Sequence, residues 1–371
     1  MNRARINAVL RASAGALVLG LSCLGAQAQT STIDPGIVSS DSIGAGEREV
    51  IQRHVSEWAP GLSSGDVARV NASRQRLSRP LESATIAVTF REAYADALVP
   101  ELRTLLGSED VGARLAALRL AGELATESSA ALLLDHLNDA DEAVRYFAIG
   151  RMASAFEQTG QHPAALSPET TLDMIRALGD KIGAPSALEG DAAVRALGRA
   201  MRIDRDGYQG ARNEAARLLG ARVSARVRAI STDPIDESEL ILALNACAAG
   251  RSAVTSTGWQ PDRDATRELI GLGGDVLALV FKRFVDQNLP PQGNRAVDVQ
   301  TTRAAENLIL FARRHDASLR GSSDTINATR LGELLESGDD RAFRTRALEL
   351  LGRDGELVRA FNFEPGRFID R

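Results

Sequence analysis

One short motif in this sequence has the spacing of a hydrolase nucleophile. Residues 61–65 read Gly-Leu-Ser-Ser-Gly, which fits G-x-S-x-G with Ser63 at the position of the nucleophile. Where this motif is catalytic, it forms a sharp turn from a strand into a helix that exposes the serine hydroxyl. Here it follows Trp58-Ala59-Pro60 at the end of a predicted helix, and no strand pattern precedes it. We therefore predict an interhelical turn at 61–65 and no catalytic serine.

The histidines are the next residues that could do chemistry. They are His54, His136, His162 and His315. None has a second histidine or a cysteine at the spacing of a zinc site. The first two fall within predicted helices, and the other two lie in or beside predicted loops. We expect half-exposed structural side chains and no metal ligands.

An acidic cluster and a glycine-rich stretch complete the candidates. Asp139, Asp141 and Glu142 lack the D-x-[DN]-x-[DN]-G spacing and the distal glutamate of a calcium loop, so helix capping is the better interpretation. Gly271-Leu272-Gly273-Gly274 has no Lys-Ser/Thr after it and no strand before it, which favours a helix break over a phosphate loop. The sequence therefore predicts no catalytic, cofactor-binding or metal-binding residue, no cofactor and no enzyme activity, and it does not specify the binding residues.

The first 28 residues have the order of a secretory signal. Arg3, Arg5 and Arg11 precede an apolar run at 14–24, and the small-residue site Ala26-Gln27-Ala28 follows. We predict cleavage after Ala28, export to the periplasm or cell envelope, and no stable membrane insertion after cleavage. An uncleaved membrane anchor is one alternative, but the apolar run is shorter than the about 20 residues of a membrane-spanning helix. A lipoprotein at Cys23 is the other alternative, but Gly20 stands where that motif has leucine.

Charge and cysteine content limit the partners of the mature chain. Cleavage removes three of the 44 basic residues and none of the 49 acidic ones, which leaves a net charge of −8. Such a chain lacks the basic surface that phosphate-backbone binding requires, so nucleic acid is excluded as an expected partner. Cys247 is the one cysteine left, in an apolar stretch, where we expect a packed side chain and no nucleophile.

A pattern of Asp, then Arg four residues later, then a small residue three further on recurs along the chain. The copies are D-V-G-A-R-L-A-A from Asp110, D-E-A-V-R-Y-F-A from Asp141, D-A-A-V-R-A-L-G from Asp191 and D-R-A-F-R-T-R-A from Asp340. Looser copies begin near Arg212 and Arg303. The aspartate suits a helix N-cap, because its carboxylate accepts from the free amides of the first turn. The arginine lies one turn on, within reach of its own aspartate or of a neighbouring repeat.

This pattern resembles the HEAT-repeat family, whose antiparallel helix pairs stack into armadillo-like superhelices. The resemblance implies that the four aspartates and their arginines form a structural polar ladder within the stack. These arginines are Arg114, Arg145, Arg195 and Arg344. The repeats are clearest over about 93–158. Arg195 and Arg212 are too close for two full repeats, so the register of the middle third stays open.

The elements that must carry these residues are helices throughout. The predicted helices span 46–58, 65–78, 88–106, 111–125, 128–137, 141–157, 169–181, 189–203, 209–229, 235–249, 262–287, 298–315, 328–336 and 339–362. Pro100 suits a kink or break in the third. We predict an all-α fold, with a flexible lead-in at 29–44 and a single α-solenoid at 45–371. The aromatic end with Phe361, Phe363 and Phe368 is either a cap on the open end of the stack, which we favour, or an exposed docking tail.

Export, a repeat fold and the lack of a catalytic set together favour a protein-binding scaffold with a protein partner. Stacked repeats provide extended surfaces for recognition, although the sequence does not say which face is used. One alternative is a ligand-handling or lyase-like HEAT-repeat enzyme, which would require a pocket containing two or more of His54, Trp58, Asp66 and Trp259. Another alternative is a structural component of an envelope assembly.

Overall fold

The computed structural model describes residues 32–163, 165–231, 235–322 and 325–370. Within these ranges the regular structure is helical, and the β pairing is limited to one isolated bridge between Thr126 and Ala165. The all-α class predicted from the sequence is confirmed. The predicted signal peptide at 1–28, with Cys23, lies outside the described residues. No helix in the described ranges is long and apolar enough to span a membrane.

The helices follow one another through short connections. In chain order they are α1 (Pro35–Val38), α2 (Ala45–Trp58), η1 (Ala59–Ser63), α3 (Val67–Ser78), η2 (Arg79–Glu82), α4 (Val88–Leu106), α5 (Val111–Leu124), α6 (Glu127–Asp135), η3 (His136–Asn138), α7 (Glu142–Gln161), α8 (Pro168–Ile182), α9 (Ala187–Ala200), α10 (Gln209–Ala229), α11 (Glu237–Val254), α12 (Arg263–Val285), η4 (Gln292–Asn294), α13 (Ala296–Leu319), α14 (Leu331–Ser337), α15 (Asp340–Leu351) and α16 (Glu356–Phe361).

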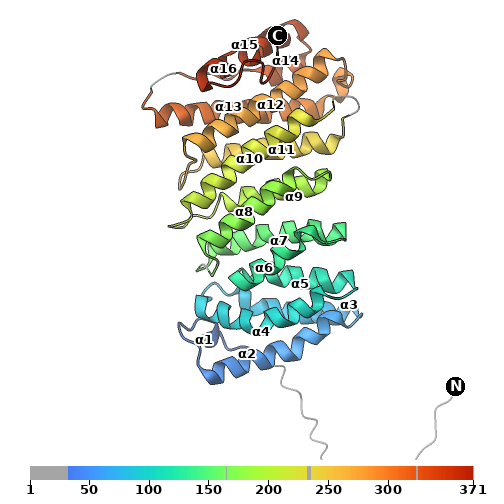
Figure 1. The fold of residues 1–371 in the computed structure, drawn as a ribbon, viewed down its shortest axis with the longest axis vertical. Helices are drawn as coiled ribbons and strands as arrows, with labels where there is room; N and C mark the ends of the chain where they lie inside the picture. The colour runs from blue at the N-terminus through green and yellow to red at the C-terminus, as the bar shows by residue number, and fades with distance from the viewer. Residues whose placement is uncertain (1–31, 164, 232–234, 323–324, 371) are drawn as a thin grey trace, which may run out of the picture.

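Consecutive helices pair and the pairs stack along the long axis of the molecule (Figure 1). The even-numbered layer is formed by α2, α4, α6, α8, α10 and α12, and the odd-numbered layer by α3, α5, α7, α9, α11 and α13. Each helix contacts its pair partner and the next helix of its own layer. The protein is therefore an α-solenoid of the HEAT and armadillo type, as the repeat pattern implied. Arg195 lies on α9 and Arg212 on α10, so their close spacing reflects two helices of adjacent pairs in an unbroken stack.

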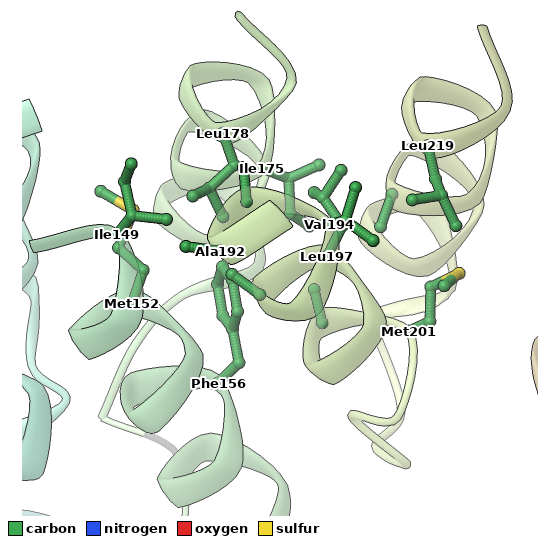
Figure 2. Packing of buried hydrophobic residues seen from close by; sticks show 14 of the residues in the cluster. Ile149, Met152, Phe156, Ile175, Leu178, Ala192, Val194, Leu197, Met201 and Leu219 are labelled. Carbon is green, nitrogen blue, oxygen red and sulfur yellow. The ribbon is translucent and has the colours of Figure 1, made fainter. Parts of the chain in front are cut away.

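The core runs between the two layers. Figure 2 shows part of this core, with Phe156 of α7, Ile175 of α8, Leu197 of α9 and Leu219 of α10, and all four are buried. Burying a large aliphatic or aromatic side chain contributes about 1.5–3 kcal/mol. Because each pair gains this only against its neighbours, no pair is expected to be stable alone.

Two of the four predicted aspartate caps are confirmed. Asp110 accepts from the Gly112 amide at 2.8 Å, and Asp141 accepts from the Ala143 amide at 2.8 Å. The prediction is wrong for Asp191, which is buried inside α9, where Ser186 is the N-cap. For Asp340 it is wrong by one residue, because Asp339 caps α15. An Asp–Arg spacing of four also occurs between two turns inside a helix, so the pattern alone does not mark a helix start.

The arginines of the predicted ladder differ in what they connect. Arg114 donates to both oxygens of Asp139 at 2.9 and 3.0 Å, and Arg145 contacts Glu189 of the next pair at 2.9 Å. These two are structural links, as expected. Arg344, by contrast, is exposed and forms no ion pair with a described residue, so its place in the ladder is not confirmed.

Several segments differ from the sequence prediction. From residue 32 the expected flexible lead-in is packed: it forms α1, Val38 is buried, and the Val38 carbonyl accepts from the Ala87 amide at 2.9 Å. The single helix expected at 339–362 is two helices, because the chain turns near Gly355. α4 continues through Pro100.

The glycine-rich stretch at 271–274 lies inside α12 and does not break it. A Cβ on Gly274 would lie 2.5 Å from the Phe368 ring, and one on Gly271 would lie 2.6 Å from the Arg367 guanidinium. The prediction of a helix break is therefore wrong, since these glycines provide room for the C-terminal segment. Phe363 and Phe368 are buried and Phe361 is half-buried, so the aromatic end is packed and is not an exposed docking tail.

Candidate interaction surface

The motif at 61–65 lies in the connection between α2 and α3, as predicted. Ser63 ends the 3-10 helix η1, is exposed, and donates to the Pro60 carbonyl at 3.4 Å. No strand precedes it among the described residues, so the geometry of a nucleophile elbow is missing there. A Cβ on Gly61 would overlap the Ser73 hydroxyl of α3. This glycine therefore serves the close approach of two helical segments.

The histidines are structural, and two of them are more buried than expected. Three ring nitrogens face backbone carbonyls: His54 Nε2 faces Arg76 at 3.2 Å, His136 Nδ1 faces Leu132 at 2.8 Å, and His315 Nε2 faces Pro261 at 2.8 Å. His54 and His315 are buried, so the expectation of half-exposed rings is wrong for them. Burial and the nearby Arg91 and Arg205 lower the pKa of His162. No group of three or more metal-ligating side chains gathers within the described ranges.

The remaining sequence candidates also have structural surroundings. Cys247 is fully buried on α11, and burial raises the pKa of its thiol, which disfavours the thiolate needed for nucleophilic attack. Asp139 accepts from the Asp141 amide at 2.9 Å, and Asp141 caps α7, so the capping interpretation of the acidic cluster is confirmed.

A cavity of about 340 Å³ next to α1 contains one of the four residues that a ligand-handling site would have to combine. His54 lines it together with Arg76 and Arg79, whereas Trp58, Asp66 and Trp259 do not. Trp58 lies under the Arg76 guanidinium at 5.4 Å, and Trp259 lies under Arg212 at 5.3 Å. The two tryptophans thus pack against separate arginines at distant parts of the stack.

On α8 and α10 of the even-numbered layer, surface charges neutralise one another. Exposed ion pairs join Arg176 to Asp173 at 3.3 Å, Arg217 to Glu214 at 2.6 Å and Arg222 to Asp180 at 2.9 Å. Such pairs are well solvated and add little to stability. This part of α8 and α10 has the character of a surface that faces solvent.

The odd-numbered layer has a different surface. The exposed large hydrophobic side chains of the described residues all lie on its helices, and they are Val67, Tyr146, Leu188, Ile241 and Leu319. Three of them occur on successive helices: Tyr146 on α7 is 39% exposed, Leu188 on α9 is 62% exposed and Ile241 on α11 is 43% exposed. Exposed apolar groups thus recur from helix to helix along this layer.

A row of hydrogen-bonded side chains crosses the same three helices. Arg195 of α9 donates to the Tyr146 hydroxyl at 3.2 Å and pairs with Asp191 at 2.6 Å. The other oxygen of Asp191 accepts from the amide of Asn245 on α11 at 2.7 Å. We call this surface the central face, and define it as Tyr146, Leu188, Asp191, Arg195, Ile241 and Asn245.

The central face includes one tyrosine and one arginine. Tyrosine and arginine are enriched in interfaces and often dominate their binding energy. Here both are held by the hydrogen bonds of the row, which lowers the entropy cost of ordering them on binding. The sequence pattern assigned Asp191 and Arg195 to a structural ladder, and it missed Tyr146, Leu188 and Ile241. These three residues are neighbours only because the stacking of α7, α9 and α11 places particular turns of the three helices side by side.

Comparisons with known proteins assign no family and no function to this chain. No family model matches the sequence, and no curated protein matches it. Similar solved structures include a designed armadillo repeat protein, at 16% identity over 70% of this chain and 99% of that one, with a TM-score of 0.36. Two engineered proteins are at 17% and 18% identity, cover 70% and 88% of this chain and 97% and 85% of their own, and have TM-scores of 0.36 and 0.31. Similarity at this level does not identify the function of the chain.

Proposed function

We propose that this chain is an exported, non-enzymatic scaffold that binds a protein partner through the central face. The observation that carries the proposal is the difference between the two layers. Exposed apolar groups and a pre-ordered polar row lie on the odd-numbered layer, whereas no exposed large hydrophobic side chain of the described residues lies on the even-numbered layer. Export is supported by the order of residues 1–28, with a basic start, an apolar run and Ala26-Gln27-Ala28.

The binding part is tested with immobilised protein beginning at Gln29. An envelope fraction of the source cell is passed over the wild type, Ile241→Asp and the control Arg222→Ala, and retained proteins are identified by mass spectrometry. We expect one dominant protein that the wild type and the control retain. A charge in the central face should weaken its binding by about tenfold or more, because hot-spot truncations cost about 2 kcal/mol. Equal retention by all three proteins, or no retained protein, would contradict the proposal.

Export is tested separately by N-terminal sequencing of the protein isolated from the periplasm. The proposal expects Gln29 as the first residue. A chain that stays in the cytoplasm with its first residues intact would contradict export. A protein that instead purifies as a self-association product of fixed stoichiometry would favour a structural role in an envelope assembly.

A further inference from the structure

A cavity of about 460 Å³ lies on the even-numbered layer, between the end of α10, the second half of α12 and the C-terminal segment. Its apolar lining includes Val227, Ile230, Leu279, Val285, Phe368 and Ile369. The volume is within the about 300–1,000 Å³ of small-molecule sites. The central face contributes none of its lining, so a ligand in this cavity would be independent of the proposed function.

The inner part of this cavity has more positive than negative charge. Arg228 and Arg367 lie 3.3 and 2.9 Å from the same oxygen of Asp275, whose side chain has no exposed surface. One carboxylate is thus shared by two guanidinium groups. The Nε of Arg367 is buried and has no hydrogen-bond acceptor among the described residues. The second oxygen of Asp275 is likewise buried and has no donor among the described residues, so the hydrogen bonding of this buried cluster is incomplete, which costs free energy.

The outer part of the cavity has one positive and two negative side chains, a net charge of −1. Lys282 lines it, and so do the exposed Asp286 and Asp370. Asp370 also lies 4.0 Å from Arg353, outside the cavity lining, and Asp286 directly follows the last residue of α12. These outer charges face water and are screened, so the excess of one positive charge beside Asp275 dominates inside.

We propose that this cavity binds a small amphiphile with one anionic carboxylate head and an aliphatic chain. The head accepts hydrogen bonds from Arg228 and Arg367, since guanidinium groups match the planar geometry of a carboxylate. The chain packs along Leu279, Val285 and Ile369. Because Arg367, Phe368 and Ile369 belong to the C-terminal segment, the bound ligand also holds that segment against α12.

The test is calorimetric titration of the mature protein with decanoate below its micelle concentration. We expect saturable binding of one decanoate per chain, and no saturable binding of decyltrimethylammonium, which has the same chain with a cationic head. Arg228→Ala should weaken binding by about tenfold or more, the loss of a charged hydrogen bond. Ala278→Trp should abolish it by filling the cavity.

Arg222→Ala, in an exposed ion pair on the same helix as Arg228, is the matched control and should leave binding unchanged. A thermal melt of each variant confirms that it is folded, and Arg228→Ala keeps the pair of Arg367 with Asp275. No saturable decanoate binding, equal binding of the cationic amphiphile, or binding that Arg228→Ala leaves unchanged would each overturn the proposal.

Discussion

Arg226 joins three helices through one largely buried guanidinium. From α10 it contacts Glu239 of α11 at 2.5 Å, and it donates to the carbonyls of Ile182 and Ala184 at 2.7 and 2.5 Å. The last carbonyls of a helix have no partner within the helix, so this arginine satisfies groups at the end of α8. It does in the middle of the stack what Arg145 does nearer the N-terminus, although it lies outside the repeated Asp–Arg pattern.

Replacing Arg226 with alanine should therefore destabilise the protein strongly. The side chains of Arg226 and Glu239 are 9% and 15% exposed, and removing one partner of a buried pair costs about 3–5 kcal/mol. Arg176→Ala is the control, because that arginine and Asp173 are 59% and 68% exposed and the pair contributes at most about 1 kcal/mol. Urea unfolding followed by circular dichroism measures both. Similar losses for the two variants would contradict a structural link at Arg226.

Asp139 should give the protein part of its pH dependence. Burial pushes the pKa of its carboxyl up, but the Asp141 amide and the Arg114 guanidinium outweigh this and hold the pKa below its usual value. A pKa that is lower in the folded state stabilises the fold above the unfolded pKa of about 3.9, and this stabilisation is lost as pH falls through the folded value.

Comparing the wild type with Asp139→Asn tests this effect. The difference in unfolding free energy should be largest near neutral pH and should shrink as the pH is lowered towards 3. Asp275 and Asp298 have raised pKa values because of burial, and their contributions have the opposite sign, but they are common to both proteins. A difference that stays constant from pH 7 to 3 would show that the charge of Asp139 does not matter.

At the scale of helices, glycine sets how closely neighbours in one layer approach. A Cβ on Gly220 of α10 would lie 2.7 Å from the Glu268 carbonyl carbon on α12, and one on Gly122 of α5 would lie 2.8 Å from the Arg151 oxygen on α7. Both contacts are with backbone, which cannot turn aside as a flexible side chain can. A Cβ on Gly150 of α7, by contrast, would have no neighbouring atom within 4 Å.

Alanine at these positions should have opposite effects. Gly220→Ala forces α10 and α12 apart and should cost about 1–3 kcal/mol, the range for an overpacked core. Gly150→Ala meets no neighbour and should stabilise by up to about 1 kcal/mol through helix propensity. Thermal melts of the two variants and the wild type measure the difference. A stabilising Gly220→Ala would mean that the two helices are not in close contact.

The helices themselves were largely predictable from the sequence. The predicted spans 88–106 and 209–229 coincide with α4 and α10. Both signals used for the prediction, apolar periodicity and helix-breaking residues, depend only on residues close in sequence. The glycines of α12 were not predictable in this way. Their role depends on Phe368 and Arg367, which lie more than ninety residues away in the chain. In the sequence, a glycine that makes space for a distant side chain cannot be told from a glycine that ends a helix.

The candidate surface shows the same limit at the scale of the whole molecule. Asp191 and Arg195 belong to the repeat pattern and both lie in the central face. Their partners Tyr146 and Asn245 are on other helix pairs. The spacing of residues in the sequence does not show which turns of these helices lie side by side, because the connections between pairs differ in length. The stack of helix pairs creates the face, and the repeat pattern alone does not outline it.

Site-specific photo-crosslinking tests the central claim most directly. A photoreactive amino acid is placed singly at Tyr146 and Ile241 on the odd-numbered layer, and at Arg176 and Arg222 on the even-numbered layer, in the full chain expressed in its own cell. The account predicts one crosslinked protein of the same mass from both odd-layer positions and none from the even-layer positions. The same protein crosslinked only from Arg176 and Arg222 would place the partner on the opposite face and contradict the account.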